Sequence, residues 1–428
     1  MPGFSPSDEG VIEALLLAEA VPNAHMIRMV PDGFLDETGA ASETGRLREM
    51  GRLAVTRLTL SDFRCYREAR IEVDSRSVVL TGPNGAGKTN LLEAISFLAP
   101  GRGLRRAKLG EIDRRVPTDS APVSPWAVAA SLTTPNGAVR IGTGREATAS
   151  GGERRVVRID GIAARSQTAL AEHVNLVWLT PQMDRLFIEG AGARRRFLDR
   201  LVLGFDPEHA GRCAAYDQAM RERGKLLREG PFDAAWLGAL EESMAQHGIA
   251  IAAARREVVT RLDAACAEDV AGFPRALLAL AGTVEDWLGA GPALSAEESL
   301  RERLAASRRQ DAESGGAAVG PHRSDLAVRH GATGVAAAQC STGEQKALLI
   351  AILLAHARLQ AGLRGAAPLM LLDEIAAHLD RERRRALFAE LEALGAQAWL
   401  TGTDEELFAE LRPSAQFLSV RDAAVTTE

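Results

Sequence analysis

The chain has 428 residues, of which 46% are hydrophobic and 25% are charged. This is long enough for two or three domains with buried cores, and the composition is typical of a soluble globular protein. No apolar run reaches membrane-spanning length, and no basic segment precedes the partly apolar stretch 11–20, which argues against a membrane span and a secretory signal. The four scattered cysteines form no CxxC pair, so we expect no zinc site, no disulfide framework and a cytoplasmic location.

The net charge of −6 is concentrated in residues 1–50, which carry nine acidic and three basic side chains. The rest of the chain is neutral overall, so local basic patches that attract nucleic acid can still exist on it. Residues 1–50 also show only weak periodicity. We expect an extension outside the folded protein, either disordered or upstream of a true start at Met50.

Strand patterns begin at residue 53 and continue to residue 179. The predicted strands are 53–60, 70–73, 77–81, 126–130, 138–141, 155–159 and 175–179. Turn residues separate the middle segments, which indicates a small antiparallel sheet. The strand 77–81 runs directly into a glycine-rich loop, and we expect a helix from Lys88 to Leu98.

Residues 192–310 show a helical pattern without sustained heptads, which predicts a compact helical lobe and not a long coiled coil. Strand patterns return at 324–328, 369–372 and 398–401, and an apolar helix follows Ser341. We therefore expect four segments, 1–50, 51–190, 191–318 and 319–428.

The glycine-rich loop fits the phosphate-loop pattern. It reads Gly82-Pro83-Asn84-Gly85-Ala86-Gly87-Lys88-Thr89. Its glycines let the backbone wrap a phosphate group, which the loop N–H groups and the helix N-terminus would hold. We expect Lys88 to reach the β- and γ-phosphates of ATP and Thr89 to bind Mg²⁺. The alternative is a glycine turn beside a surface lysine, and the flanking strand and helix favour the phosphate loop.

Two carboxylates end the apolar strand 369–372. Asp373 at the strand tip suits a magnesium ligand, and Glu374 beside it suits the base or orienter for an attacking water. A strand that ends in Asp-Glu is common by itself. Downstream of a phosphate loop it becomes a specific signal.

The segment Ser341-Thr342-Gly343-Glu344 precedes the apolar helix and permits two compatible interpretations. Ser341 and Glu344 have the spacing of a capping box. The segment also resembles the ABC signature, in which Ser341, Gly343 and Glu344 would face the γ-phosphate bound by another subunit. A helix N-terminus is a place where an anion binds, so both roles can hold together.

Together the motifs predict an α/β fold, namely an ABC-type P-loop ATPase head with an antiparallel β subdomain and an inserted all-α lobe. The head would comprise 51–190 and 319–428, and the lobe would be 191–318. Gln182 follows a buried strand where ABC ATPases carry a glutamine that senses magnesium and the γ-phosphate. Thr403 stands near the position of their catalytic histidine, so we expect slow hydrolysis with a threonine in its place.

Several segments resemble the RecF family within the ABC/SMC class, over about residues 52–410. They are Leu60-Ser61-Asp62-Phe63-Arg64-Cys65-Tyr66, the arginine-rich stretch 190–199, the helix 216–223, Gly320-Pro321-His322-Arg323-Ser324-Asp325-Leu326 and Thr401-Gly402-Thr403-Asp404. The lobe also has the size of the arm in that family. Transporter ATPases resemble this motif set with a shorter insertion, and SMC proteins have a far longer one.

The resemblance implies a dimer that ATP and Mg²⁺ close on duplex DNA, with two nucleotides sandwiched between phosphate loop and opposing signature. Arg64 and Asn90 would complete the nucleotide-binding set. The dimer would favour single-strand gaps, act with RecO and RecR to load RecA, and open on slow, DNA-stimulated hydrolysis. Asp380 would lie along the dimer interface.

Two groups of basic residues are candidates for DNA contact, because arginine suits phosphate binding. One is Arg102, Arg105, Arg106, Lys108, Arg114 and Arg115, and the other is Arg154, Arg155 and Arg158. Solvated faces and ion pairs are the more ordinary explanation.

Three other classes remain as alternatives. A transporter subunit needs a short coupling domain and a membrane partner, a nuclease-linked ATPase needs a further carboxylate-rich metal domain, and a small-molecule P-loop kinase would lack the segment Ser341–Glu344.

Overall fold

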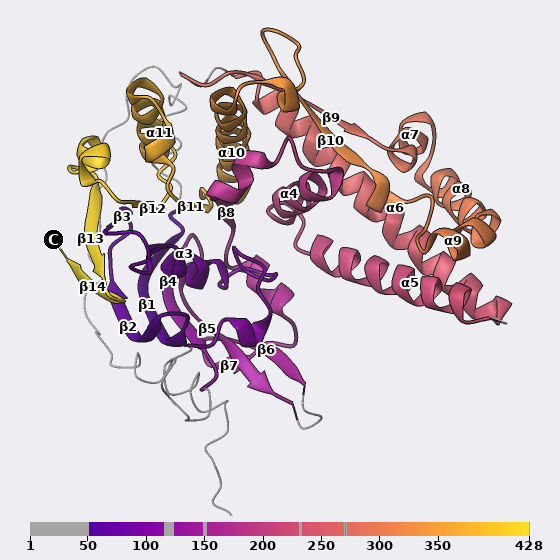
Figure 1. Cartoon of the computed structure of the whole chain (residues 1–428), viewed down its shortest axis with the longest axis horizontal. Helices are drawn as coiled ribbons and strands as arrows, with labels where there is room; N and C mark the ends of the chain where they lie inside the picture. Colours follow the sequence, from indigo (N-terminus) through magenta and orange to yellow (C-terminus); the bar gives the residue numbers. More distant parts are fainter. Residues whose placement is uncertain are drawn as a thin grey trace, which may run out of the picture. The chain divides into compact units, whose positions relative to one another are not determined.

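The computed structural model describes residues 51–114, 124–148, 152–230, 233–268, 270 and 272–427. The predicted extension 1–50 and Arg115 lie outside the described residues. The chain forms two compact units (Figure 1). Of the described residues, the first unit contains those up to 178, together with 361–377 and those from 387 onward. The second unit contains 179–360 and 378–386. The division into four segments that the sequence predicts stays a prediction.

The first unit contains an antiparallel sheet with the strand order β2-β1-β4-β5-β6-β7. These strands are β1 Ala54–Phe63, β2 Tyr66–Glu72, β4 Ala127–Thr134, β5 Gly137–Ala147, β6 Glu153–Ile159 and β7 Ile162–Ala163. Phe63 pairs with Tyr66, so only Arg64 and Cys65 form the turn between β1 and β2. The predicted small antiparallel sheet is therefore present, with longer strands than the sequence pattern indicates.

A second sheet of the first unit has the order β14-β13-β3-β12-β11-β8. Its strands are β3 Ser77–Thr81, β8 Leu176–Leu179, β11 Leu369–Leu372, β12 Ala398–Gly402, β13 Ala415–Arg421 and β14 Ala424–Thr427. Strand β3 pairs in parallel with β12 and β13, and β12 pairs in parallel with β11. The carboxyl ends of β3, β11 and β12 therefore meet at one edge, where open α/β sheets bind their ligands.

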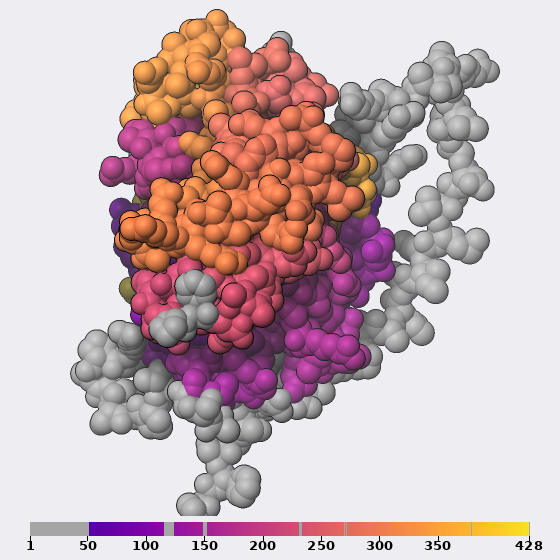
Figure 2. All heavy atoms as spheres, turned by 90° about the vertical axis from the view of Figure 1, so that its right-hand side faces the viewer, coloured from indigo at the N-terminus to yellow at the C-terminus, as the bar shows by residue number. Residues whose placement is uncertain are grey.

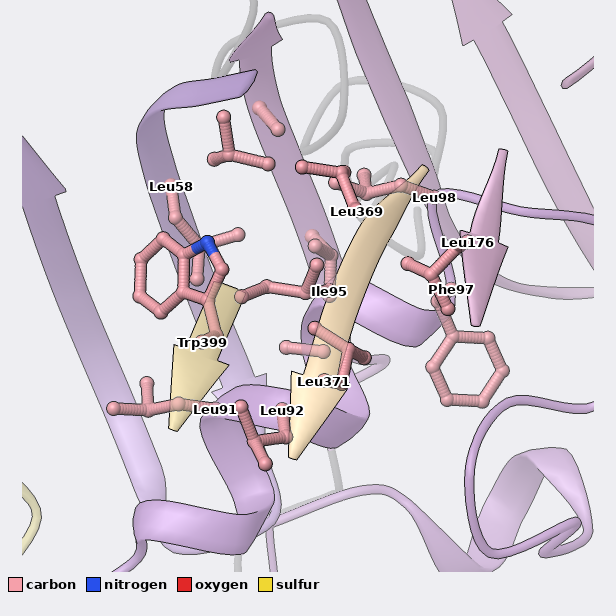
Figure 3. Close-up of a cluster of buried hydrophobic side chains, with 14 of the residues drawn as sticks. Leu58, Leu91, Leu92, Ile95, Phe97, Leu98, Leu176, Leu369, Leu371 and Trp399 are labelled. Atoms are coloured by element: carbon pink, nitrogen blue, oxygen red, sulfur yellow. The ribbon is translucent and has the colours of Figure 1, made fainter. Parts of the chain in front are cut away.

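Helix α3, Lys88–Ser96, packs between these two sheets. Its residues Leu91, Leu92 and Ile95 are fully buried. Figure 3 shows them in a cluster that also includes Leu371 of β11 and Trp399 of β12. Because both sheets contribute to this cluster, the helix that follows the phosphate loop lies inside the main hydrophobic core. Three short 3-10 helices complete the first unit: η1 Leu109–Glu111, η2 Gln167–Glu172 and η7 Glu405–Leu411.

Arg155 of β6 fills the other end of this core. Its guanidinium lies 5.2 Å from the centre of the Phe97 ring and donates to carbonyl oxygens of Phe97, Ala99 and Gly101. These carbonyls follow the last turn of α3, where helices leave carbonyl oxygens without partners. Burial lowers the pKa of Arg155 from 12.5 to about 9. Arg155 is therefore an internal cap for the segment that ends α3, which favours a structural role for it over a DNA contact.

The second unit is mainly helical. It contains η3 Pro181–Arg185, α4 Ala191–Leu203, α5 His209–Glu229, α6 Ala234–Ala265, α7 Thr283–Ala290, α8 Ala293–Ala306, α9 Arg308–Ser314, η4 Pro321–Arg323 and η5 Ala337–Gln339. Helices α5 and α6 form a long pair, and the space-filling view shows α8 and α9 (orange) lying over it (pink; Figure 2). Three further helices lie between residues 342 and 393: α10 Thr342–Arg364, η6 Ala376–His378 and α11 Arg381–Ala393.

One strand interrupts the stretch that the sequence predicts to be all helical. Strand β9, Ala276–Ala281, pairs antiparallel with β10, Asp325–His330. Its sequence, Ala-Leu-Leu-Ala-Leu-Ala, contains no β-branched residue and has high helix propensity. Pairing with β10, which is distant in sequence, overrides this local preference.

Buried charges hold the helices of the lobe together. Arg223 of α5 pairs with Glu241 of α6 at 3.0 Å and with Asp311 of α9 at 2.8 Å. All three residues are at most 2% exposed. Since an unpaired buried charge is costly, this network strongly favours one arrangement of the three helices.

Helix α10 has the length and composition of a membrane-crossing helix, with a mean hydropathy of 1.4, although the sequence analysis found no run of that kind. Buried residues make up 78% of the window, as in the core helix of a soluble protein. Length and composition are therefore weak evidence that α10 spans a membrane.

His356 of α10 is fully buried, with Nε2 2.9 Å from the carbonyl oxygen of Leu201, and burial lowers its pKa from 6.5 to about 4.

We predict that Arg155→Met lowers the free energy of unfolding by about 2–4 kcal/mol, because the carbonyl oxygens after α3 lose their donor. The matched variant is Arg154→Met, whose side chain is 61% exposed and pairs with Glu146. It should cost no more than about 1 kcal/mol. Urea unfolding followed by circular dichroism measures both values. Equal losses in the two variants would contradict the capping role.

We predict that His356 makes stability depend on pH between its unfolded pKa of 6.5 and its folded pKa of about 4. In this window the unfolded chain binds a proton that the native protein does not, so stability falls as the pH falls. The loss amounts to about 3 kcal/mol across the window. His356→Gln should flatten the pH dependence of the urea midpoint, and His247→Gln, at a half-buried position, should not. An unchanged slope in His356→Gln would refute the assignment.

Candidate nucleotide-binding site

The loop Gly82–Gly87 connects β3 to α3, and two of its glycines are required by contact as well as by conformation. Gly82 has φ 142°, and an added Cβ would lie 2.1 Å from the carbonyl oxygen of Val420. Gly87, the N-cap of α3, has φ 113°, and a Cβ there would lie 2.6 Å from Tyr66 Oη. No side chain caps α3 at Gly87, so the helix N-terminus is open to an anion.

Lys88 is the first residue of α3, directly after the loop, and is 5% exposed. Its Nζ donates to the carbonyl oxygens of Gly82 at 2.6 Å and of Pro83 at 2.9 Å. Burial lowers the pKa of Lys88, and the carboxylates of Glu374 and Asp373 partly offset this effect. The ammonium group is thus held between the loop and two carboxylates, where a phosphate would meet it.

Asp373 and Thr89 come together although they are far apart in sequence. Thr89 Oγ1 donates to Asp373 Oδ1 at 2.9 Å, and its distance to Oδ2 is 3.2 Å. Asp373 follows β11 and is 5% exposed. A hydroxyl and a carboxylate are the oxygen ligands that Mg²⁺ prefers. Thr89 and Asp373, two of the three residues predicted to act on magnesium, are therefore close enough to share one ion.

Glu374 has an unusual backbone conformation, with φ 51°. For a residue with a Cβ, the left-handed region costs about 1 kcal/mol or more. The N–H of Glu374 donates to Thr401 Oγ1 at 2.9 Å, and Thr401 Oγ1 donates to Asp373 Oδ1 at 2.8 Å. Thr401 was not among the predicted site residues, although the segment 401–404 that contains it resembles the RecF family and includes the candidate Thr403.

Thr403 lies two residues beyond Thr401 and is exposed. The next residue, Asp404, caps η7 by accepting from the N–H of Glu406 at 2.9 Å. In this turn it is the hydroxyl of Thr401 that reaches the Asp373 carboxylate, and a catalytic role for Thr403 stays a prediction.

Arg64 is engaged by a buried carboxylate. It donates to Glu93 of α3 through Nε at 2.9 Å and Nη2 at 2.6 Å, and Arg105 donates to the same carboxylate at 3.0 Å. Glu93 is fully buried. Arg105 also donates to Asn90 Oδ1 at 2.7 Å, and Asn90 Nδ2 donates to Cys65 Sγ at 3.1 Å. Arg64 and Asn90 thus border α3, and sequence reasoning missed Glu93 because a glutamate inside a helix gives no signal of its own.

The signature segment lies in the second unit and forms the capping box that its spacing predicts. The N–H of Ser341 donates to Glu344 Oε2 at 2.8 Å, and the N–H of Glu344 donates to Ser341 Oγ at 3.3 Å. The N–H and the hydroxyl of Ser341 both donate to Glu344 Oε2 and lower the pKa of Glu344, the backbone bond most strongly. Ser341 and Gly343 are exposed, and a Cβ at Gly343 would meet nothing within 4 Å. The N-terminus of α10 is therefore accessible to a ligand.

Gln182 is exposed in η3 of the second unit. Lys346 of α10 pairs with Asp184 of the same turn at 3.3 Å, so the turn and the signature helix are linked. The predicted roles of Gln182, Ser341, Gly343 and Glu344 toward nucleotide and metal stay predictions.

Most of the predicted DNA-contacting arginines have partners within the chain. Arg105 holds Glu93, Arg114 pairs with Asp62 at 2.9 Å, and Arg154 pairs with Glu146. Together with the burial of Arg155, these pairs favour the structural explanation for both clusters.

The helical unit contains three potential metal ligands in one group, Asp199, His209 and Cys213. Both carboxylate oxygens of Asp199 already accept from Arg255, at 2.8 and 2.9 Å. His209 Nε2 lies 2.9 Å from the same carboxylate. The ion pair between Arg255 and Asp199 therefore explains why Asp199, His209 and Cys213 lie together.

Comparison with known proteins places the chain in a family. Residues 54–426 match the family described as the RecF/RecN/SMC N terminal domain. The chain is 50% identical over 371 residues to the DNA replication and repair protein RecF of Allorhizobium ampelinum, covering 86% of this chain and 97% of that protein. The chain belongs to the RecF family. It is also 49% identical to RecF of Rhizobium meliloti over 374 residues, which are 87% of this chain and 98% of that protein.

Solved structures of the RecF family have the same fold. A structure described as the recombination mediator protein RecF-ATPrS in the RecFOR pathway matches 88% of this chain and 99% of its own, with a TM-score of 0.76 and 20% identity. A second, described as RecF-ATP, matches 89% and 98%, with a TM-score of 0.75 and 21% identity. The ABC-type head predicted from the sequence is thereby confirmed as the fold class.

We predict that Gly82→Ala destabilises the protein much more than Gly85→Ala. Both positions have positive φ, which costs about 1 kcal/mol for alanine. An added Cβ at Gly85 meets nothing within 4 Å, whereas at Gly82 it strikes the backbone of Val420. Gly82→Ala should therefore cost about 3 kcal/mol or more in urea unfolding. Similar losses in the two variants would show that contact with β13 does not select glycine here.

Proposed function

We propose that this RecF-family protein binds and hydrolyses ATP with Mg²⁺, and that ATP acts as a switch for binding DNA. The observation that carries the proposal is the meeting of Lys88, Thr89, Asp373 and Glu374 at the carboxyl edge of the parallel sheet, beside the open N-terminus of α3. These are the groups that cradle phosphates, hold a metal and orient a water in P-loop ATPases.

Each residue has a distinct role in this proposal. The loop N–H groups and Lys88 bind the phosphates, and Thr89 and Asp373 hold Mg²⁺, which neutralises charge on the phosphate oxygens. Glu374 accepts a proton from, or orients, the water that attacks the γ-phosphate. The absence of a histidine at 401–404 supports slow hydrolysis, which suits a switch more than a motor.

The signature would act on a nucleotide held by a second copy of the chain. Ser341 and Gly343 are exposed at the N-terminus of a long helix, which favours an anion. Two such contacts related by a two-fold axis would close a homodimer around two ATP molecules. Gln182 and Thr403 would complete each site, and Asp380 would lie along the interface.

The proposed partner of the closed dimer is duplex DNA at single-strand gaps. The family's name and the description of the matched structures as a recombination mediator of the RecFOR pathway support a role with RecO and RecR, in which the dimer helps to load RecA. Hydrolysis, stimulated by DNA, would open the dimer and release it. We propose that the protein works in the cytoplasm and not with a membrane partner.

The test is sedimentation velocity of the purified protein with gapped duplex DNA, with and without ATP and Mg²⁺. We expect an ATP-dependent dimer on DNA. Lys88→Met removes a phosphate contact, and Ser341→Arg places a bulky cation at the signature, so both variants should remain monomeric and lose at least about tenfold in DNA affinity.

Two surface variants serve as matched controls. Lys225→Met changes a lysine that is 68% exposed on α5, and Ser295→Arg changes an exposed serine of α8. Both should dimerise like the wild type. A wild type that stays monomeric with ATP and DNA would refute the dimer, and ATP-dependent assembly only with a membrane partner would favour a transporter subunit. DNA cleavage with Mg²⁺ or Mn²⁺ would favour a nuclease-linked ATPase.

A further inference from the structure

Thr401 links the side chain of Asp373 to the backbone of Glu374 at the end of β11. It is the last residue but one of β12, next to β11, and it is completely buried. Its hydroxyl forms one bond to the side chain of Asp373 and one to the backbone of Glu374. A single side chain thus touches the predicted metal ligand and the residue that carries the predicted water-orienting carboxylate.

The direction of both hydrogen bonds is fixed by chemistry. An ionised carboxylate can only accept, so Thr401 Oγ1 donates its hydrogen to Asp373 Oδ1 at 2.8 Å. A backbone N–H can only donate, so the same oxygen accepts from Glu374 at 2.9 Å. The hydroxyl therefore cannot rotate without breaking one of the two bonds.

The bond to Asp373 acts together with that of Thr89. Asp373 Oδ1 accepts from Thr89 at 2.9 Å as well as from Thr401. The carboxylate is thus held from two sides, and hydrogen bonds of this kind to ligating groups tune metal binding. The bond from Thr401 would stay in place when Thr89 and Asp373 share a metal ion.

The bond to Glu374 stabilises a strained turn. Glu374 has φ 51°, a conformation that a residue with a Cβ adopts only where its surroundings impose it. The N–H that would otherwise lack a partner after the end of β11 is satisfied by Thr401. This contact supports the backbone conformation from which the Glu374 side chain extends.

We propose that Thr401 is a positioning residue for ATP hydrolysis, which sets Asp373 for the metal ion and Glu374 for the attacking water through one hydroxyl. The inference rests on the proposed ATPase function and adds a residue to it. It does not require Thr401 to contact the nucleotide. The exposed Thr403 plays no part in this contact.

The experiment compares Thr401→Val, which keeps the shape and removes the hydroxyl, with Thr401→Ser, which keeps the hydroxyl. The matched control is Thr143→Val. Thr143 is equally buried in β5, donates to the carbonyl oxygen of Val156 at 2.9 Å and accepts from Arg155 at 2.8 Å. It therefore has the same burial and the same number of bonds in the antiparallel sheet.

Three measurements are made on each full-length variant. They are the turnover number of ATP hydrolysis, the Mg²⁺ concentration that gives half-maximal turnover, and binding of a fluorescent ATP analogue in EDTA. Thermal unfolding checks that each variant is folded.

For Thr401→Val we expect turnover to fall about tenfold to a hundredfold, the effect of losing a hydrogen bond to a charged group. The half-maximal Mg²⁺ concentration should rise about tenfold. Nucleotide binding in EDTA should change less than about twofold, because the loop and Lys88 are intact. Thr401→Ser should restore turnover and Mg²⁺ dependence to within about threefold of the wild type. Thr143→Val should keep wild-type Mg²⁺ dependence even where its unfolding temperature falls.

Wild-type turnover and Mg²⁺ dependence in Thr401→Val would overturn the proposal. A Thr401→Ser variant as impaired as Thr401→Val would also overturn it, because the methyl group and not the hydroxyl would then be the important part of the side chain. Failure of the ATPase function gives a different result. A wild type that neither binds the analogue nor hydrolyses ATP refutes that function first, and the role of Thr401 with it.

Discussion

The burial of α3 between two sheets is the constraint on which the site depends. A helix of nine residues is too short to be stable in water, so α3 exists because Leu91, Leu92 and Ile95 fill the core between the sheets. Burial on both sides fixes the direction of the helix axis. Its N-terminus then emerges at the carboxyl edge of the parallel sheet, beside the ends of β11 and β12, and Arg155 satisfies the carbonyl oxygens at its other end.

The charged groups around α3 are paired in a way that follows from this burial. Glu93 has no access to solvent, and the charge of its carboxylate is compensated by Arg64 and Arg105. An arginine that the sequence assigns to nucleotide or DNA can thus also compensate a buried charge. The lobe uses the same principle, since Arg223, Glu241 and Asp311 specify how its helices meet. In both places arginine serves the interior of the protein.

The residues proposed to act on ATP belong to both compact units of the chain. The phosphate loop, Asp373, Glu374 and Thr401 lie in the first, and Gln182 and the signature segment lie in the second. In the proposed dimer, the signature segment of one copy would act on the nucleotide that the phosphate loop of the other copy holds. Such an arrangement suits a switch, because a ligand stabilises the state to which it binds more tightly.

The sequence by itself determined the features that follow from local pattern. Strands β3 and β11 have the predicted bounds, α3 begins at Lys88, and Ser341 and Glu344 form the capping box, because alternation, glycine loops and capping spacing act over a few residues. The tertiary structure alone decided the contacts between distant segments. Pairing with β10 makes β9 a strand. Contact with the carbonyl oxygens after α3 makes Arg155 a helix cap, and the adjacency of β11 and β12 places the Thr401 hydroxyl beside Asp373. These outcomes depend on which strands become neighbours, and a single sequence carries that information only through the packing of the whole core.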